Sequence, residues 1–411
     1  MTTADVLDSH DDPTGALKAA HSAIPPSYWG REQAWIKHQL LQSYLEKLLL
    51  IVGMAAKRQG KIEICYVDCF SGPWGTSQLE STSIAVSLRT MAKCQQKLAQ
   101  LGVNATMRAL YIERDDEAFS NLQNYLVNET PAAVSAQCLH GDFVDLRDQI
   151  LKWSGLEAFT FFFIDPKGWK SIGIKKLQPL LQRPRSEFLI NFIYDFINRT
   201  ASMTEWQSEI AEFLGAPIEA VQELDNHSPQ EREERLLGLY RNSLKESLPP
   251  QKTPYVGRTA YVRVLDPNRE RAKYHLVYLS SHPKGTIEFM TISHGVEAIQ
   301  QRVRADRRKD AREQASRIRD MFADEMPMLP PGVVDEKIVD QYWLEILRKH
   351  PVVVNEAIFA DILEATNWMP QDLQASLLRL IKARKIKNLD APHPRSSRPL
   401  HPEKSERLVL L

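Results

Sequence analysis

This chain lacks an excess of charge of either sign, because its 52 Lys and Arg residues balance its 52 Asp and Glu residues. Its overall charge therefore gives no reason to expect a nucleic acid or a membrane as partner. The longest apolar run near the N-terminus, residues 48–56, is too short to cross a bilayer. Residues 1–13 also lack the basic and apolar parts of a signal peptide. We therefore expect a cytoplasmic protein that contacts no membrane.

Cysteine is scarce, and its spacing does not suggest a metal site. The four residues are Cys65, Cys69, Cys94 and Cys138. Cys65 and Cys69 lie four residues apart in or beside one predicted strand, which is not the spacing of a zinc clip. We expect reduced thiols in the core and no bound metal.

What the sequence does contain is typical of a globular protein. Hydrophobic residues make up 43% of the chain, which excludes a disordered protein. The length of 411 residues allows one large domain with a smaller one, or two or three domains.

Strand and helix patterns alternate through the first half of the chain. Apolar stretches predict strands at residues 62–68, 108–113, 134–140, 159–164 and 186–194. Apolar residues at helical spacing predict helices at 28–58, 84–101, 115–128, 146–153 and 174–182. This order predicts an α/β fold with a doubly wound, Rossmann-type parallel sheet. The continuously apolar segment 159–164 is typical of a central strand.

The alternation stops after residue 198. Residues 203–214 and 229–248 predict helices with no strand between them, so we expect a helical insertion at about 199–255. Residues 273–279 and 287–292 then predict two further strands, separated by a turn at 282–285, that complete the sheet in antiparallel fashion. A basic helix at about 296–321 is either a solvated or linker helix or a contact for phosphates.

The Pro-rich residues 326–332 mark the clearest domain boundary. Beyond it, helices at 335–348, 355–366 and 369–383 and a short strand at 386–389 predict a small winged-helix domain. Four basic residues on its third helix and wing would present a positive surface to DNA or RNA: Arg379, Lys382, Arg384 and Lys385. A winged helix that docks to protein has the same pattern, so both interpretations stay open.

The predicted domain organisation follows from these boundaries. We expect a flexible N-terminus at 1–26, a Rossmann-type domain at 27–325, a linker at 326–334, a winged-helix domain at 335–391 and a disordered tail at 392–411.

Four predicted strands end in, or lead directly to, a carboxylate: Asp68, Glu113, Asp142 and Asp165. In an open α/β sheet the ligand lies at the carboxyl ends of the strands, so the four would surround one ligand. Any one of them alone could be a helix N-cap or a surface acid. That four strands of one predicted sheet all lead to a carboxylate favours a ligand site over four separate caps or surface acids.

S-adenosylmethionine (SAM) gives each of these groups a role. Asp68 would hold polar groups of the ligand directly or through water, and Glu113 would accept hydrogen bonds from both ribose hydroxyls. Asp142 would accept from the adenine amino group while the N–H of Phe143 contacts the ring. Asp165 and Pro166 would face the transferred methyl group. The turn after the first strand would lie against the amino-acid and ribose parts, through Phe70, Ser71, Gly72, Pro73 and Gly75.

NAD is the main rival ligand, because an acid at the end of the second strand also suits its ribose. The turn reads FSGPWG at residues 70–75 and does not match G-x-G-x-x-G. Pro73 also removes an N–H donor that a pyrophosphate needs. A methyl donor without a pyrophosphate tolerates this turn.

Three segments resemble the three-Cys-motif partner protein (TcmP) family. They are YVDCFSGP at residues 66–73, FIDPKGW at 163–169 and EFLINFIYDFINR at 187–199, of which 191–199 is the most specific part. Residues 35–45 and 274–285 also fit, so the resemblance covers about residues 29–321. The tail resembles the winged-helix domain that some members carry.

The resemblance implies a methyltransferase-like Rossmann fold in a bacterial protein. It also implies a companion protein with a three-cysteine motif that resembles radical SAM enzymes, but no settled substrate. Where the family tends to have Gly-Ser-Pro, residues 81–83 read STS, so the next helix could start differently. Amino-group methyltransferases use Asp/Asn-Pro-Pro-Tyr/Phe, whereas KGW follows Asp165-Pro166 here, which argues against base methylation. Trp169 could still stack on a planar substrate.

These observations predict a SAM-dependent methyltransferase, or a methyltransferase-like partner, that acts on nucleic acid or on its companion protein. Asp165 would orient and deprotonate the acceptor, with Pro166 and Trp169 beside it. The alternative is a non-catalytic nucleic-acid- or protein-binding module with a degenerate Rossmann fold and a winged helix.

Overall fold

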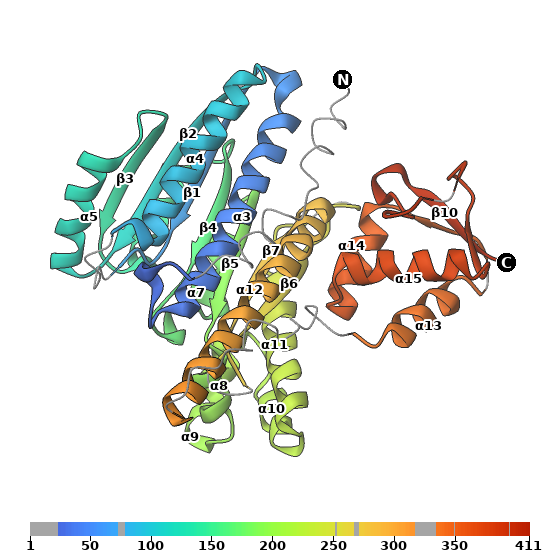
Figure 1. The fold of residues 1–411 in the computed structure, drawn as a ribbon. Helices are drawn as coiled ribbons and strands as arrows, with labels where there is room; N and C mark the ends of the chain where they lie inside the picture. The colour runs from blue at the N-terminus through green and yellow to red at the C-terminus, as the bar shows by residue number, and fades with distance from the viewer. Residues whose placement is uncertain are drawn as a thin grey trace. The chain divides into compact units, whose positions relative to one another are not determined.

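The computed structural model describes residues 24–72, 79–250, 253–266, 271–316, 334–348, 350–393 and 395–411 (Figure 1). The chain divides into two compact units. The sheet unit comprises Leu41–Asp266 and Glu270–His282, and the C-terminal unit comprises Met1–Leu40, Pro267–Arg269 and Pro283–Leu411. Most of the predicted flexible N-terminus (1–26) and of the predicted linker (326–334) lies outside the described residues.

The sheet unit is built on a seven-stranded sheet with the order β3-β2-β1-β4-β5-β7-β6 (Figure 1). β1 to β5 run parallel, and β7 is antiparallel to both of its neighbours. This order is typical of the methyltransferase type of Rossmann fold and confirms the predicted fold class. The strands are β1 (Lys61–Asp68), β2 (Asn104–Glu113), β3 (Val134–His140), β4 (Phe159–Ile164), β5 (Ser186–Phe192), β6 (Arg258–Leu265) and β7 (Ala272–Ser280).

Helices cover both faces of the sheet. On one face, alternate strand residues such as Val67, Ile112 and Ile164 pack in one core with α6 and α7. On the other face, Tyr111 hydrogen-bonds Ser87 of α4, and Tyr44 of α3 packs against Phe161. The helices are α3 (Glu32–Ala55), α4 (Ser83–Gln100), α5 (Asp116–Glu129), α6 (Phe143–Ser154) and α7 (Ile174–Leu181). All five confirm predicted helices.

The predicted helical insertion is confirmed. It contains α8 (Tyr194–Ala201), α9 (Thr204–Leu214), α10 (Ile218–Gln222) and α11 (Pro229–Glu246). α11 starts with Pro229 at its first position and with a capping box between Ser228 and Glu231, which satisfies the free N–H groups of its first turn. The insertion joins the core of the sheet unit, where Phe213 stacks on Tyr240 at 5.3 Å between ring centroids.

The end of the sheet differs from the prediction in two respects. The predicted strand at 287–292 is wrong, because these residues lie inside α12 (Pro283–Ser316) of the C-terminal unit. Val296, Ile299 and Val303 are buried at helical spacing, and the short apolar run before them cannot distinguish a strand from a buried helix. The second antiparallel strand is β6 instead, which the sequence analysis did not identify.

The C-terminal unit contains the predicted winged helix. Its elements are α13 (Glu336–Ile346), β8 (Val352–Val354), α14 (Glu356–Thr366), α15 (Pro370–Lys382), β9 (Ile386–Asn388) and β10 (Glu406–Leu410). The strands form an antiparallel sheet in the order β8-β10-β9, and α12 packs against α14.

The predicted disordered tail at 392–411 is wrong. β10 lies in the centre of the small sheet, and its buried Glu406 accepts hydrogen bonds from both Arg395 and Asn388. These bonds hold the segment to β9, which a composition rich in Pro and Arg does not reveal.

Cys65, Cys69 and Cys94 are buried, as predicted, and Cys138 is half-buried. Burial raises the pKa of Cys65 to about 11 and that of Cys94 to about 12, so both thiols are protonated at neutral pH.

None of the helices in the described ranges is long and apolar enough to cross a membrane. Short 3₁₀ turns occur at Pro26–Tyr28, Lys57–Gln59, Leu79–Ser81, Trp169–Ile172, Glu223–Asn226 and Pro402–Lys404.

Candidate functional site

Three of the predicted carboxylates lie on the same face and the same edge of the sheet. Asp68 ends β1, Glu113 ends β2 and Asp165 follows β4, and these strands are adjacent and parallel. Side chains alternate along a strand, and the preceding residues Val67, Ile112 and Ile164 all enter the core with α6 and α7. The three carboxylates therefore face the side of the sheet that α3 and α4 cover.

Asp68 organises the loop that follows β1. It is fully buried, and its two oxygens accept hydrogen bonds from the N–H of Phe70 at 3.1 Å and from the hydroxyl of Ser83 at 2.8 Å. Ser83 is the first residue of α4, whose N-cap is Thr82. The negative charge is thus placed at a helix N-terminus, where the helix dipole stabilises it. Asp68 ties the loop to α4, so its effect on a ligand passes through the loop.

Ser71 fixes the same loop to the neighbouring strand. Its N–H donates to the carbonyl of Ile112 at 2.8 Å, and its hydroxyl oxygen accepts from the N–H of Ile112 at 3.1 Å. Phe70 packs against Phe143 with ring centroids 5.3 Å apart. The predicted site residues Pro73 and Gly75 lie outside the described residues.

Gly72 lies directly against Glu113. A β-carbon at Gly72 would lie 2.7 Å from Cδ of Glu113 and closer still to Oε2, so only glycine leaves this carboxylate in place. Oε1 of Glu113 accepts the N–H groups of Arg114 and Asp115, each at 2.8 Å. Glu113 is 7% exposed, and within the described part of the chain Oε2 accepts no hydrogen bond. One oxygen is therefore fixed by the backbone while the other is available to a ligand.

Asp142 is the N-cap of α6 and accepts the N–H of Val144 at 2.9 Å. Its other oxygen lies 3.8 Å from the guanidinium of Arg114, which links the end of β3 to the end of β2. Phe143 is buried in the core. The structure thus gives Asp142 the ordinary role of a helix cap, and its position beside Arg114 keeps it within the same row of strand ends.

Asp165 has a partner that the sequence analysis did not identify as a site residue. Nδ2 of Asn191, on β5, donates to Oδ1 of Asp165 at 2.7 Å. Tyr274, on β7, lies near the same carboxylate: burial and, to a smaller extent, the charge of Asp165 raise the pKa of its hydroxyl. The sequence signal was available, because Asn191 is a polar residue within the apolar stretch 188–192 that closes β5.

Trp169 is not available as a stacking platform in this structure. It is 5% exposed and packs against Phe196 and Phe213, with ring centroids 5.8 and 5.2 Å away. Both partners belong to the helical insertion, so Trp169 joins the insertion to the sheet. Pro166 is also buried.

The arrangement fits the predicted cofactor at the ribose position. Gly72 has no side chain beside Oε2 of Glu113, and within the described part of the chain this oxygen accepts no hydrogen bond. A sugar with two hydroxyls needs a carboxylate oxygen of this kind as acceptor. No cluster of three or more His, Cys, Asp or Glu side chains that could hold a metal occurs in the described ranges.

Comparisons with known proteins add little to this geometry. No profile of a known protein family matches the chain, and no curated protein matches its sequence. The chain is similar to an O-methyltransferase from Bacillus cereus in complex with S-adenosylhomocysteine (SAH), at 12% identity over 65% of this chain and 90% of that one, with a TM-score of 0.31.

Two other solved structures give matches of the same kind. A Legionella pneumophila protein of the DUF519 family matches at 9% identity over 58% of this chain and 85% of that one, with a TM-score of 0.31. A loganic acid methyltransferase with SAH matches at 8% identity over 66% and 88%, with a TM-score of 0.25. These scores are too low to carry an argument, so the fold assignment depends on the strand order.

The four predicted nucleic-acid-binding residues differ in their surroundings. Arg379 forms ion pairs with Asp340 at 2.8 Å and with Glu336 at 3.2 Å. Its charge is therefore paired with acids of the winged helix itself. Lys382, Arg384 and Lys385 are exposed, and none of them has an ion pair within the described part of the chain.

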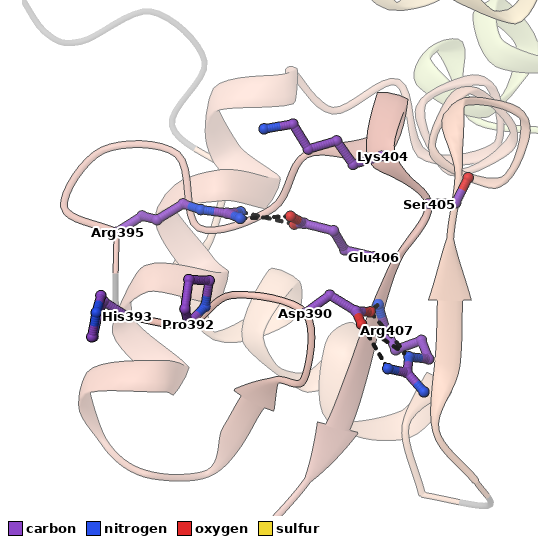
Figure 2. A pocket seen from close by; sticks show the side chains of 8 residues that line it. All are labelled: Asp390, Pro392, His393, Arg395, Lys404, Ser405, Glu406 and Arg407. Carbon is purple, nitrogen blue, oxygen red and sulfur yellow. Dashed lines mark hydrogen bonds and ion pairs between the residues drawn. The ribbon is translucent and has the colours of Figure 1, made fainter.

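A cavity of about 810 Å³ lies in the wing between β9 and β10 (Figure 2). Four of its charged side chains form two pairs: Arg395 binds Glu406 through two hydrogen bonds of 2.9 and 2.6 Å, and Arg407 binds Asp390 (Figure 2). Lys404 also lines the cavity. The two pairs hold the wing in shape.

Proposed function

We propose that the sheet unit binds SAM and is a SAM-dependent methyltransferase. The observation that carries the proposal is the contact between Gly72 and Glu113, because it leaves one oxygen of a buried carboxylate facing residue 72, which has no side chain. A strand order typical of methyltransferases supports it.

The residues would divide the work as follows. Bound SAM supplies an electrophilic methyl group, so the protein contributes mainly positioning. Glu113 holds the ribose through Oε2, and Asp68 and Ser71 keep the loop around Gly72 in shape. Asp165, held by Asn191, lies on the same face and orients the acceptor.

Isothermal titration calorimetry with SAM and with SAH tests the proposal. We expect both to bind, and Glu113→Ala to weaken binding about 10–100-fold, because it removes charge-assisted hydrogen bonds of about 1.5–3 kcal/mol. Glu117→Ala is the matched control, since Glu117 is an exposed acid on α5. Absence of heat with either ligand would favour the non-catalytic binding module.

The resemblance of residues 191–199 to the three-Cys-motif partner family supports a proposal about family and companion. We propose that the chain belongs to the three-Cys-motif partner family and that its companion bears a three-cysteine motif. Co-expression of the tagged chain with a companion encoded nearby, followed by size-exclusion chromatography, tests this. A complex of fixed stoichiometry supports the proposal, and separate elution of the two proteins contradicts it.

A second function is proposed for the C-terminal unit, namely contact with DNA or RNA. The supporting observation is that Lys382, Arg384 and Lys385 lie within four positions at the end of α15 and are exposed. Exposed cations without ion pairs are those that phosphates attract most strongly.

A further inference from the structure

Asn191 is a buried amide whose orientation is fixed by Asp165. It is 7% exposed, and its Nδ2 donates to Oδ1 of Asp165 at 2.7 Å. The reverse orientation would place two acceptor oxygens against each other, so the amide nitrogen must face the carboxylate. Oδ1 of Asn191 then points elsewhere. Among the described residues this oxygen is buried and accepts no hydrogen bond.

A buried carbonyl oxygen without a donor is rare in a folded protein. β4 and β5 pair in parallel up to Ile164 and Ile190, so Asp165 and Asn191 are the next residues at the carboxyl edge of the sheet. That edge is where an open α/β sheet binds its ligand. Oδ1 of Asn191 therefore lies, as an acceptor with no donor among the described residues, at the edge of the sheet where such a ligand binds.

We infer that Oδ1 of Asn191 and the carboxylate of Asp165 together bind an amino group of the methyl acceptor, an inference that rests on the proposed function. Both groups present acceptor oxygens, and neighbouring strands are about 4.8 Å apart, so a group with two hydrogens can reach both. An N–H₂ group has two hydrogens and a hydroxyl has one. A carboxylate has none and would be repelled by Asp165. The acceptor class is therefore a primary amine or an amide nitrogen.

Asn191 and Asp165 are the only protein groups that this methyl transfer requires. Asn191 and Asp165 hold the two hydrogens, which directs the nitrogen lone pair toward the methyl group. The N–C bond forms as the C–S bond breaks, and the electron pair of that bond stays on sulfur as the neutral thioether of SAH. The extra proton on nitrogen passes to the carboxylate of Asp165 and then to water.

The first experiment identifies the atom that is methylated. The full chain is incubated with [methyl-³H]SAM and, separately, total bacterial RNA and total bacterial protein, and each product is hydrolysed to nucleosides or amino acids and separated by chromatography. Label in an N-methyl nucleoside or an N-methyl amino acid is expected. Label in O-, S- or C-methyl products, or no label in either fraction, overturns the inference.

The second experiment separates the acceptor site from the cofactor site. Asn191→Ala is expected to lower the rate of transfer about 100-fold through loss of alignment, while calorimetry gives an unchanged affinity for SAH. Asn121→Ala, an exposed amide on α5, is the control for both measurements. A folded Asn191→Ala protein that loses SAH affinity would show that Asn191 binds the cofactor and would overturn the inference. Absence of SAH binding by the unmodified chain would overturn the proposed function as well.

Discussion

Gly72 and Glu113 are in direct contact, although they belong to the loop after β1 and to the end of β2: a β-carbon on Gly72 would lie 2.7 Å from Cδ of Glu113. The loop can therefore close on the carboxylate only while residue 72 has no side chain. This contact makes the glycine, as well as the acid, part of the candidate site.

We expect Gly72→Ala to weaken the binding of SAH about 10–100-fold, because the added methyl group displaces Glu113 and costs its charge-assisted hydrogen bonds. Calorimetry measures the change. Gly238→Ala, in α11, is the matched control: apart from neighbouring residues of its own helix, no atom lies within 4 Å of the added methyl group. That variant should keep SAH affinity and gain about 0.5–1 kcal/mol of stability from helix propensity. An unchanged affinity in Gly72→Ala would remove Glu113 from the ribose site.

Glu187 provides a prediction about pH. This residue of β5 is buried, and its carboxylate accepts hydrogen bonds from the hydroxyls of Tyr44, Tyr278 and Ser280 at 2.8–2.9 Å. Burial raises its pKa, and the three hydrogen bonds lower it only in part. The unfolded chain therefore loses this proton at a lower pH than the folded chain does. The stability that Glu187 contributes is present below its ordinary pKa of 4.5 and is lost as pH rises through its folded value.

Glu187→Gln should remove this dependence, since glutamine does not titrate. The free energy of urea unfolding of the unmodified chain, relative to that of the variant, should fall as pH rises above about 4.5. Glu219→Gln, at an exposed acid of α10, should show no such trend. A difference between the chain and its Glu187 variant that stays constant with pH, or grows in favour of the unmodified chain, contradicts the prediction.

The sequence was sufficient for the parallel strands and for the acids at their ends. Strands buried on both faces read as continuous apolar runs, so a carboxylate at the end of such a run is visible in the sequence. Asp68, Glu113 and Asp165 were found in this way. The fold class followed from the alternation of these strands with helices.

The remaining features depend on contacts between distant residues. Trp169 is buried by Phe213 of the insertion, and Arg379 is neutralised by Asp340 of a different helix. Neither partner can be inferred from spacing along the chain. β6 was missed because its sequence, RTAYVRVL, mixes two arginines with apolar residues, and Arg258 is nevertheless buried.

The C-terminal unit predicts different effects for its basic residues. We expect Lys382→Ala and Lys385→Ala each to weaken binding of a labelled 20-base-pair DNA duplex or of a single-stranded RNA. For duplex DNA, each should also reduce the magnitude of the negative slope of log K against log salt by about 0.9, because one phosphate contact is lost. Arg379→Ala should leave binding unchanged and cost about 1 kcal/mol of stability or less, because its partly exposed ion pairs are lost.

Fluorescence anisotropy at several salt concentrations measures these effects. Lys337→Ala, at an exposed lysine of α13, is the control that changes the net charge equally. If all the lysine variants weaken binding by the same factor, the attraction is a general effect of charge and α15 has no specific surface.

Arg384 predicts a conflict between stability and binding. It follows α15 with a φ of 54°, in the left-handed region that favours glycine. The N–H of Lys385 donates to the carbonyl of Leu380 at 2.9 Å, which closes the helix in a Schellman motif. We expect Arg384→Gly to raise the free energy of unfolding by about 1 kcal/mol through relief of the left-handed backbone, and to weaken nucleic-acid binding through loss of an exposed cation.

Asn367 supplies the matched control. It ends α14 with the same φ of 54°, and it carries no charge. Asn367→Gly should change stability by less, because asparagine tolerates this conformation better than arginine does, and should leave nucleic-acid binding unchanged. Urea unfolding measures the stability of both variants, and fluorescence anisotropy measures their binding of nucleic acid. If Arg384→Gly gained stability and bound nucleic acid as before, the cation would have no part in the interface, and the strained arginine would have no functional explanation in this surface.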